Sequence, residues 1–143
     1  MSSGTEGNPV CTLAEANFSH ADMHACSFHQ VFLHRSDFTA ARFVQGIMEK
    51  NLAMGLKMSL FQGRESRFVD CVMDGSIMRY ADFLGAGFGG TRLCGADLRG
   101  CVLGETLFDR ANLGRTVIEG QGNRFRRRPQ PDEENAWGRE GEQ

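Results

Sequence analysis

The chain has 143 residues, a formal net charge of −2 and 41% hydrophobic residues, which is the size and balance of one domain. No apolar run approaches the roughly 18 residues that a membrane-spanning helix needs, and no basic segment followed by an apolar one opens the sequence. We therefore expect a cytoplasmic protein with no membrane partner.

Residues 1–10 are polar and are predicted to form a flexible N-terminal segment. From residue 11 to residue 120 the chain repeats every five residues. Starting at Leu13, 20 of 22 such positions carry a large apolar residue, where the composition would place about six by chance. We call these the central positions, and the repeat that they define sets the expected fold.

A second column of residues lies two places before each central position. It consists mostly of Ala, Ser, Thr, Cys and Gly, and we call its members the small positions. A period of five fits neither the 3.6 residues of a helical turn nor the alternation of a flat strand. It indicates a coil that turns a corner every five residues, with one large and one small side chain directed inward from each repeat.

The most regular stretches are residues 80–100, YADFLGAGFGGTRLCGADLRG, and residues 111–114, ANLG. They resemble the A-(D/N)-L-x-x signature of the pentapeptide repeat family, over residues 11–120. The resemblance implies an all-β fold, a right-handed quadrilateral parallel β-helix with four pentapeptides in each of about 5.5 coils. At a strand spacing of roughly 4.8 Å the rod would be about 26 Å long. Residues 121–143 would form a C-terminal cap and flexible tail.

Glycine stands two places after seven of the central positions, where the coil turns a corner. Glycine tolerates positive φ, which such turns require. Because most of these glycines lie in the second half of the repeat, we expect corner geometry to differ between the halves. The seven are Gly55, Gly75, Gly85, Gly90, Gly95, Gly100 and Gly120.

The middle of the repeat departs from the pattern. Two central positions shrink to Ala53 and Gly63, and two small positions grow to Leu56 and Phe61. Large and small residues could exchange places inside one continuous coil, which would keep the interior volume constant. Alternatively, residues 47–61 could form a short helix, since apolar residues recur there at intervals of four. The phase resumes afterwards with no residue gained or lost, which favours the continuous coil.

Four of the five cysteines occupy small positions, where a thiol serves as a small hydrophobic group. Only Cys94, beside a central position, is predicted to point outward. Stacked neighbours would stand exactly one coil of four repeats apart in the sequence, and no two cysteines do. We therefore expect no disulfide and a reducing compartment. The four inward cysteines are Cys11, Cys26, Cys71 and Cys101.

Four closely spaced histidines have the appearance of a metal site in the linear sequence. A four-sided coil places them on four different sides, whereas ligands must converge to within about 2.1 Å of one ion. No metal site is therefore predicted, and neither a cofactor site nor a catalytic site is expected on a rod with short corners. These residues are His20, His24, His29 and His34.

A coil of four pentapeptides also gathers apolar residues on its outside. One side would stack Phe32, Leu52 and Val72 with Met54 at their flank, and the next would stack Leu60 on Tyr80 with Ile77 beside them. A contiguous exposed apolar patch usually marks a contact surface. The alternative is that such residues stabilise a sheet face by cross-strand pairing. The candidate partner surface is Phe32, Leu52, Met54, Leu60, Val72, Ile77 and Tyr80.

We therefore expect a non-enzymatic protein-binding or scaffolding rod whose partner is an unidentified protein or a second copy of the chain. The resemblance also implies an alternative, a Qnr-type DNA mimic that binds DNA gyrase or another topoisomerase. DNA mimicry needs a strong negative field, whereas residues 11–120 carry 12 acidic and 11 basic residues. This balance disfavours the alternative.

The C-terminal tail offers three further interpretations. Four arginines flank Phe125, but acidic residues follow closely, so direct nucleic-acid binding is the least favoured. Covering the last coil is the most favoured, because a solenoid needs its terminal edge protected. Docking of a partner through Trp137 ranks second.

Overall fold

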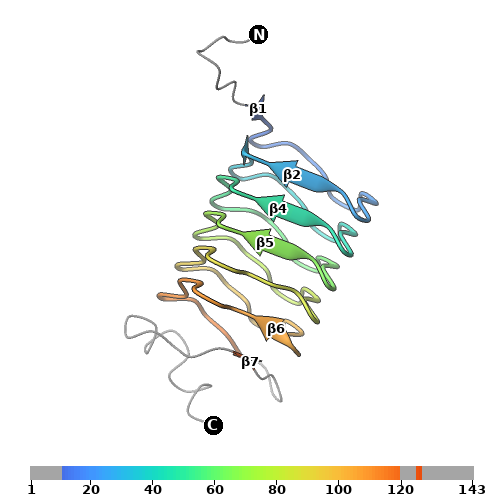
Figure 1. Cartoon of the computed structure of the whole chain (residues 1–143). Coiled ribbons are helices and arrows are strands. Elements are labelled where there is room, and N and C mark those ends of the chain that lie inside the picture. Colours follow the sequence, from blue (N-terminus) through green and yellow to red (C-terminus); the bar gives the residue numbers. More distant parts are fainter. Residues whose placement is uncertain (1–10, 120–124, 127–143) are drawn as a thin grey trace.

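The computed structural model describes residues 11–119 and the backbone of residues 125–126. Within these residues the chain forms short strands and turns without a helix (Figure 1). The strands are short because the chain changes direction every five residues. They are β1 (Cys11–Thr12), β2 (Ser27–His29), β3 (Val31–Phe32), β4 (Ile47–Glu49), β5 (Arg67–Val69), β6 (Thr106–Leu107) and β7 (Phe125–Arg126).

Residues whose numbers differ by 20 lie side by side in parallel along the described repeat. β1 pairs with β3, β2 with β4 and β4 with β5, each in this register. Isolated parallel bridges at the same interval continue the pairing as far as Asp97 and Val117. Each stretch of four repeats therefore stacks on the stretch before it, and the chain is a β-helix, as predicted (Figure 1).

Backbone hydrogen bonds join each coil to both of its neighbours. Leu33 donates its N–H to the carbonyl of Leu52 at 2.7 Å, and Leu52 donates to the carbonyl of Val31 at 3.1 Å. Such alternation satisfies the polar backbone groups of an interior coil from both sides. Within residues 11–119, the first coil has a neighbouring coil on one side only.

Side chains at the central positions form the core. Phe68, Phe88 and Phe108 belong to successive coils and stack with ring centroids 4.8 and 5.3 Å apart and planes 7° from parallel. Phe83 meets Phe88 edge-on at 5.1 Å. All four rings are fully buried. Aromatic stacking and the loss of apolar surface to water therefore act along the whole axis of the rod.

The middle of the repeat stays in the coil. Leu56 and Phe61 are fully buried at small positions, and Ala53 is buried at a central one. A Cβ atom on Gly63 would lie 2.9 Å from the ring of Phe61, so that ring occupies the space the glycine leaves. The exchange of large and small residues is thus confirmed, and the alternative of a helix over residues 47–61 is wrong.

Every fifth residue from 15 to 115 has a positive φ. Six of these corner residues are glycines with φ of 66–75°, and fifteen are other residues with φ of 52–62°. We expected the corners of the first and second halves of the repeat to differ in geometry. This prediction is wrong, since the corner residues of both halves have the left-handed conformation. A non-glycine residue there costs about 1–2 kcal/mol, which the packing and hydrogen bonds of the coil must offset.

This geometry predicts opposite effects for two glycines. Gly95 has φ of 71° and Gly87 has φ outside the left-handed region, and a Cβ on either would meet no atom within 4 Å. Gly95→Ala should lower the free energy of unfolding by about 1–2 kcal/mol through backbone strain alone. Gly87→Ala should raise it by about 0.4–1 kcal/mol, because the unfolded chain loses entropy. Urea denaturation measures both, and equal effects would contradict the corner assignment.

Buried polar side chains at small positions bridge backbone groups of the preceding coil. At the corner after β2, Asn51 accepts from the N–H of Val31 at 2.8 Å and donates to the carbonyl of Phe28 at 3.0 Å. After β5, Thr91 accepts from the N–H of Cys71 at 3.2 Å and donates to the carbonyl of Phe68 at 2.9 Å. Each bridge satisfies one backbone donor and one backbone acceptor inside the core. The presence of Asn51 and Thr91 at these positions therefore reflects hydrogen bonding as well as small size.

The cysteine prediction is half correct. Cys71 and Cys101 are buried, and burial raises the pKa of their thiols to about 11 and about 12, so both are protonated and unreactive at neutral pH. Cys11 and Cys26 are exposed, contrary to the prediction, because both lie in the first described coil, which no described coil covers. All five cysteines are free thiols, and Cys94 is half-buried.

At the C-terminal end, β7 pairs with β6 and so lies beside the last coil. Thr106 is opposite Phe125 and Leu107 is opposite Arg126, a register that falls just short of the full coil seen in the other strand pairs. The predicted N-terminal segment 1–10, Trp137 and the rest of the predicted cap and tail lie outside the described residues. Among the residues that are described, no helix is long and apolar enough to cross a membrane.

Candidate protein-interaction surface

Residues immediately before the central positions line the outer sides of the coil. Phe32 is paired directly with Leu52, and Leu52 with Val72, so the three form one ladder across three coils. Leu52 is 38% exposed, whereas Phe32 and Val72 are half-buried and so less exposed than predicted. We call these three residues and Met54 the apolar stripe.

Met54 and His34 fix the flank of the apolar stripe. The N–H of Met54 donates to Nδ1 of His34 at 3.2 Å. The imidazole of His34 stacks on the ring of Phe32, with centroids 5.8 Å apart and planes at 24°. Met54 itself is 46% exposed. A flexible thioether therefore stands beside a rigid aromatic pair, a combination suited to packing against another apolar surface.

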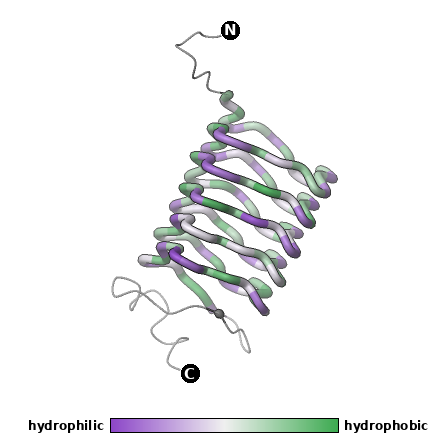
Figure 2. Tube along the Cα trace, in the orientation of Figure 1, coloured by the Kyte–Doolittle hydropathy of each residue, from purple (hydrophilic) through white to green (hydrophobic). Residues whose placement is uncertain are grey.

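Polar residues bound the apolar stripe at both ends of its side. Towards the N-terminus, Phe32 pairs with Thr12. Towards the C-terminus, Val72 pairs with Arg92, whose guanidinium contacts the carboxylate of Asp74 at 2.8 Å. Along the trace, hydrophobic and hydrophilic residues alternate throughout the rod (Figure 2). The apolar stripe is therefore a limited patch within a mixed surface.

The other three predicted surface residues lie on the adjoining side and its corner. Leu60 and Tyr80 occupy corresponding corners of adjacent coils and are 55% and 66% exposed. Ile77 is paired with Lys57 and Asp97, so its ladder is charged and not apolar. The structure thus brings four of the seven candidates together as the apolar stripe and leaves these three as a separate group.

Three exposed apolar residues were missed by sequence reasoning. They occupy outward positions equivalent to those of the apolar stripe, and the length of the coil could have located them. Val102 pairs with Asp82, Val117 with Asp97, and Leu107 with Gly87, so none of these pairs extends an apolar ladder. The three are Val102, Leu107 and Val117.

The histidines lie in four successive repeats, and His29 and His34 make separate contacts. His29 contacts Glu49 at 2.9 Å, and nowhere in residues 11–119 do three His, Cys, Asp or Glu side chains gather as metal ligands. Two open hollows mix charged and small residues. One is lined by Arg67, Val69, Asp70, Gly87, Gly89, Leu107, Asp109 and Arg110, and the other by Glu15, Asn17, Arg35, Asp37 and Lys57.

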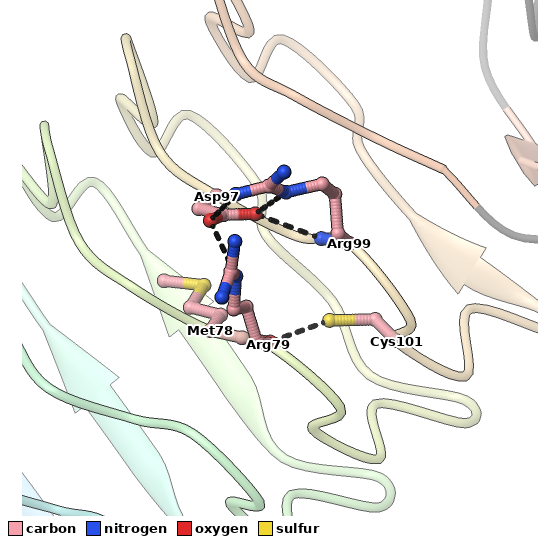
Figure 3. A network of polar contacts seen from close by, with 5 residues as sticks. All are labelled: Met78, Arg79, Asp97, Arg99 and Cys101. Atoms are coloured by element: carbon pink, nitrogen blue, oxygen red, sulfur yellow. Dashed lines mark hydrogen bonds and ion pairs between the residues drawn. The ribbon is translucent and has the colours of Figure 1, made fainter.

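Asp97 lies at the centre of a network of charged side chains (Figure 3). Arg99 donates to its two carboxylate oxygens at 2.9 and 2.8 Å, and Arg79 of the preceding coil donates at 2.9 Å. These bonds, those from Arg99 foremost, lower the pKa of Asp97 to about 2. The thiol of Cys101 donates to the carbonyl of Met78 beneath this network at 2.7 Å.

The Asp97 network predicts a pH-dependent stability. Because the folded pKa lies below the unfolded value, the contribution is complete above about pH 4 and is lost as pH falls towards 2. It amounts to about 2 kcal/mol. Asp97→Asn should therefore be destabilising at pH 7 and much less so near pH 2.5, as measured by urea denaturation. Asp22→Asn is the control, since Asp22 is 67% exposed and 3.8 Å from Arg42. A pH-independent loss for Asp97→Asn would contradict this assignment.

Ten charged residues on the described surface are paired with a partner one coil away. These ion pairs join residues whose numbers differ by 18 or 20, so each pair sets opposite charges on neighbouring coils. The pairs between coils are Glu15 with Arg35, Asp22 with Arg42, Asp82 with Arg64, Asp97 with Arg79, and Asp74 with Arg92.

The family model for pentapeptide repeats matches residues 11–48 and 86–120, in eight copies. The chain belongs to the pentapeptide repeat family. The unmatched residues between these two segments include the exchange of Leu56 and Phe61 with Ala53 and Gly63. They nevertheless continue the same coil, so this pentapeptide repeat protein is regular in structure where it is irregular in sequence. No curated protein sequence matches the chain.

Solved structures of other pentapeptide repeat proteins have a similar fold. A trypsin-treated form of QnrB1, a plasmid-mediated fluoroquinolone resistance protein, matches with a TM-score of 0.60 and 16% identity over 76% of this chain. The match spans 60% of that QnrB1 chain. Rfr23 of the cyanobacterium Cyanothece 51142 matches at 15% identity over 78% of this chain and 86% of its own, with a TM-score of 0.39. At 16% identity, the likeness to QnrB1 concerns the fold alone.

Proposed function

We propose that this protein is a non-enzymatic binding rod that presents the apolar stripe to a protein partner. The proposed rod is a right-handed, four-sided β-helix of about five and a half coils, formed by residues 11–120. Two observations support this shape: the parallel register of four repeats, and a corner with positive φ at every fifth residue. A rod of this kind offers flat, rigid sides on which binding residues need little ordering.

The ladder of Phe32, Leu52 and Val72 is the observation that carries the proposal. Three apolar residues paired in register on successive coils, with Met54 at their flank, interrupt a surface of mixed charged and polar residues. Exposed apolar residues that occur singly need no explanation, but a contiguous patch favours contact with another apolar surface. The partner would cover the apolar stripe and leave the ion pair of Arg92 and Asp74 at the rim.

A binding role accounts for the outward residues better than catalysis does. Neither hollow described above is lined by serine, cysteine or histidine, so neither combines a nucleophile with a histidine base. Side chains on different sides of the rod point away from one another, whereas an active site requires them to converge. The described surface is therefore suited to recognition.

Affinity capture with matched variants tests the proposal. The double variant Phe32→Asp and Leu52→Asp places two charges in the apolar stripe, and Thr12→Asp with Asn112→Asp places two charges on the same side outside it. Quantitative mass spectrometry should find a protein whose recovery falls at least about tenfold with the first variant and not with the second. Equal recovery by both variants, with both folded, would refute the proposal.

The Qnr-type alternative is a rod that binds DNA gyrase. The fold similarity to QnrB1 favours it, while the alternating ion pairs between coils disfavour a DNA-like field. A supercoiling assay with purified gyrase separates the two functions. The binding rod that we propose should leave supercoiling unchanged at a large excess, and protection of gyrase from a quinolone would favour the alternative.

A further inference from the structure

We infer that the hollow between β5 and β6 binds an extended segment of a protein partner that carries an acidic and a basic side chain two places apart. This hollow lies on the side of the rod that bears β2, β4 and β5, and it shares no residue with the apolar stripe (Figure 1). Gly87 and Gly89 form its floor, and a Cβ on Gly87 would meet no atom within 4 Å. Glycine at such a position lets a ligand approach the backbone closely.

The floor of the hollow has a backbone donor that lacks its usual acceptor. In the preceding repeat, Asp82 accepts from the N–H of Leu84 at 3.1 Å and from the guanidinium of Arg64 at 2.7 Å. Gly87 takes the place of Asp82 one repeat later, so this carboxylate is missing. The N–H of Gly89, which corresponds to that of Leu84, has no hydrogen-bond partner among the described residues. A ligand can therefore supply the acceptor that residue 87 does not.

Arg67 provides the second donor for the same acceptor. It pairs with Gly87 across the coils, it lines the hollow, and it makes no ion pair within residues 11–119. A carboxylate above Gly87 would accept from the N–H of Gly89 and lie beside this guanidinium. Both bonds would be charge-assisted, which makes them stronger than bonds between neutral groups. The chemistry of the floor thus favours an acidic side chain.

Two carboxylates at the other end of the hollow exclude a simple anion. Asp70 and Asp109 line it together with Arg110, and in the described part of the chain none of the three forms an ion pair. The carboxylate of Asp70 extends over Gly90. The lining therefore combines two arginines with two aspartates and has no net charge. It disfavours phosphate and nucleic acid, and it favours a ligand with a positive group near its carboxylate.

An extended polypeptide supplies these two charges at the required spacing. Its side chains two places apart lie on the same face, roughly 6.6 Å from each other, as do the positions of Gly87 and Gly89 along the floor. An acidic residue above Gly87 thus places a basic residue near Asp109. Val69 and Leu107 are the apolar members of the lining, against which the stems of both side chains can pack.

A nuclear magnetic resonance titration of the nitrogen-15-labelled full chain tests the inference. The probe is the blocked peptide Gly-Asp-Val-Lys-Gly, which should shift the amide resonances of Gly87 and Gly89 with a Kd on the order of 1 mM. The same peptide with asparagine in place of aspartate should bind at least about tenfold more weakly. Equal binding of both peptides would overturn the inference. Acetate or inorganic phosphate that binds as tightly as the peptide would also overturn it, since the hollow would then be a simple anion site.

Gly87→Asp supplies the missing carboxylate from the chain itself. The φ of Gly87 lies outside the left-handed region and the space for a side chain is open, so the variant should fold. Its carboxylate should slow hydrogen exchange of the Gly89 amide and abolish binding of the peptide. Asn17→Asp is the matched control, because it adds a carboxylate at an equivalent outward position whose oxygen already accepts from Ser19 at 2.9 Å, and it should leave binding unchanged.

Arg67→Gln keeps the inference testable if Gly87→Asp fails to fold. It removes the charged donor beside Gly87 and should weaken binding of the peptide at least about tenfold. Undiminished binding in either variant would overturn the inference. The apolar stripe contributes no residue to the hollow, so variants of the stripe such as Leu52→Asp should bind the peptide normally.

Discussion

Replacing Phe88 with alanine is expected to lower the free energy of unfolding by about 3–5 kcal/mol. The ring of Phe88 stacks between Phe68 and Phe108 and meets Phe83 edge-on, and it is fully buried. Its removal would leave a cavity in the middle of the aromatic ladder. Neighbouring coils cannot close this cavity, because their spacing is set by backbone hydrogen bonds on every side.

Chemical denaturation followed by circular dichroism measures the effect of Phe88→Ala. Tyr80→Ala is the control, since this side chain is the most exposed of the large apolar residues described, and its loss should cost less than about 1 kcal/mol. Phe88→Leu should recover part of the loss by filling part of the cavity. A Phe88→Ala protein as stable as Tyr80→Ala would contradict the core described above.

Replacing Asn51 with leucine is expected to cost about 2–6 kcal/mol although the two side chains are similar in size, because two buried backbone groups lose their partners at about 1–3 kcal/mol each. The change would leave the N–H of Val31 and the carbonyl of Phe28 without the hydrogen bonds that Asn51 supplies at 2.8 and 3.0 Å. Hydrophobic burial alone would predict the opposite effect, since Asn51 is fully buried and leucine is apolar.

Urea denaturation of Asn51→Leu decides between these expectations. Asn112→Leu is the matched control, because Asn112 lies on the outside of the coil and its side chain accepts from the nearby N–H of Gly114 at 3.1 Å. Its replacement should change the stability by less than about 1 kcal/mol. A neutral or stabilising Asn51→Leu would show that the bridge contributes nothing.

The five-residue period predicts the β-helix because it determines both the corners of each coil and the pairing between coils. A large residue at each fifth position allows only a coil with a corner in each repeat, and parallel pairing between successive coils then follows from stacking four repeats on four. The same reasoning predicts the exchange of Phe61 with Gly63, since the interior volume must remain constant. The apolar ladder of Phe32, Leu52 and Val72 follows from the register alone.

Other features depend on atoms that the period does not specify. The exposure of Cys11 and Cys26 arises at the end of a stack, where an inward position has no neighbour to cover it. Positive φ at non-glycine corners arises because the coil must turn whatever residue is present. The bridge made by Asn51 depends on which corners have backbone groups that no other backbone group hydrogen-bonds. This is a property of local geometry and not of the hydrophobic pattern.

Site-specific photocrosslinking in living cells tests the proposed function most directly. A photoreactive phenylalanine analogue at position 52 would lie in the middle of the apolar stripe, and the same analogue at position 112 would lie on the same side of the rod outside it. We predict a discrete crosslinked protein from position 52 and none from position 112. Equal crosslinking from both positions, or a product from position 112 alone, would contradict the assignment of the apolar stripe as the binding surface.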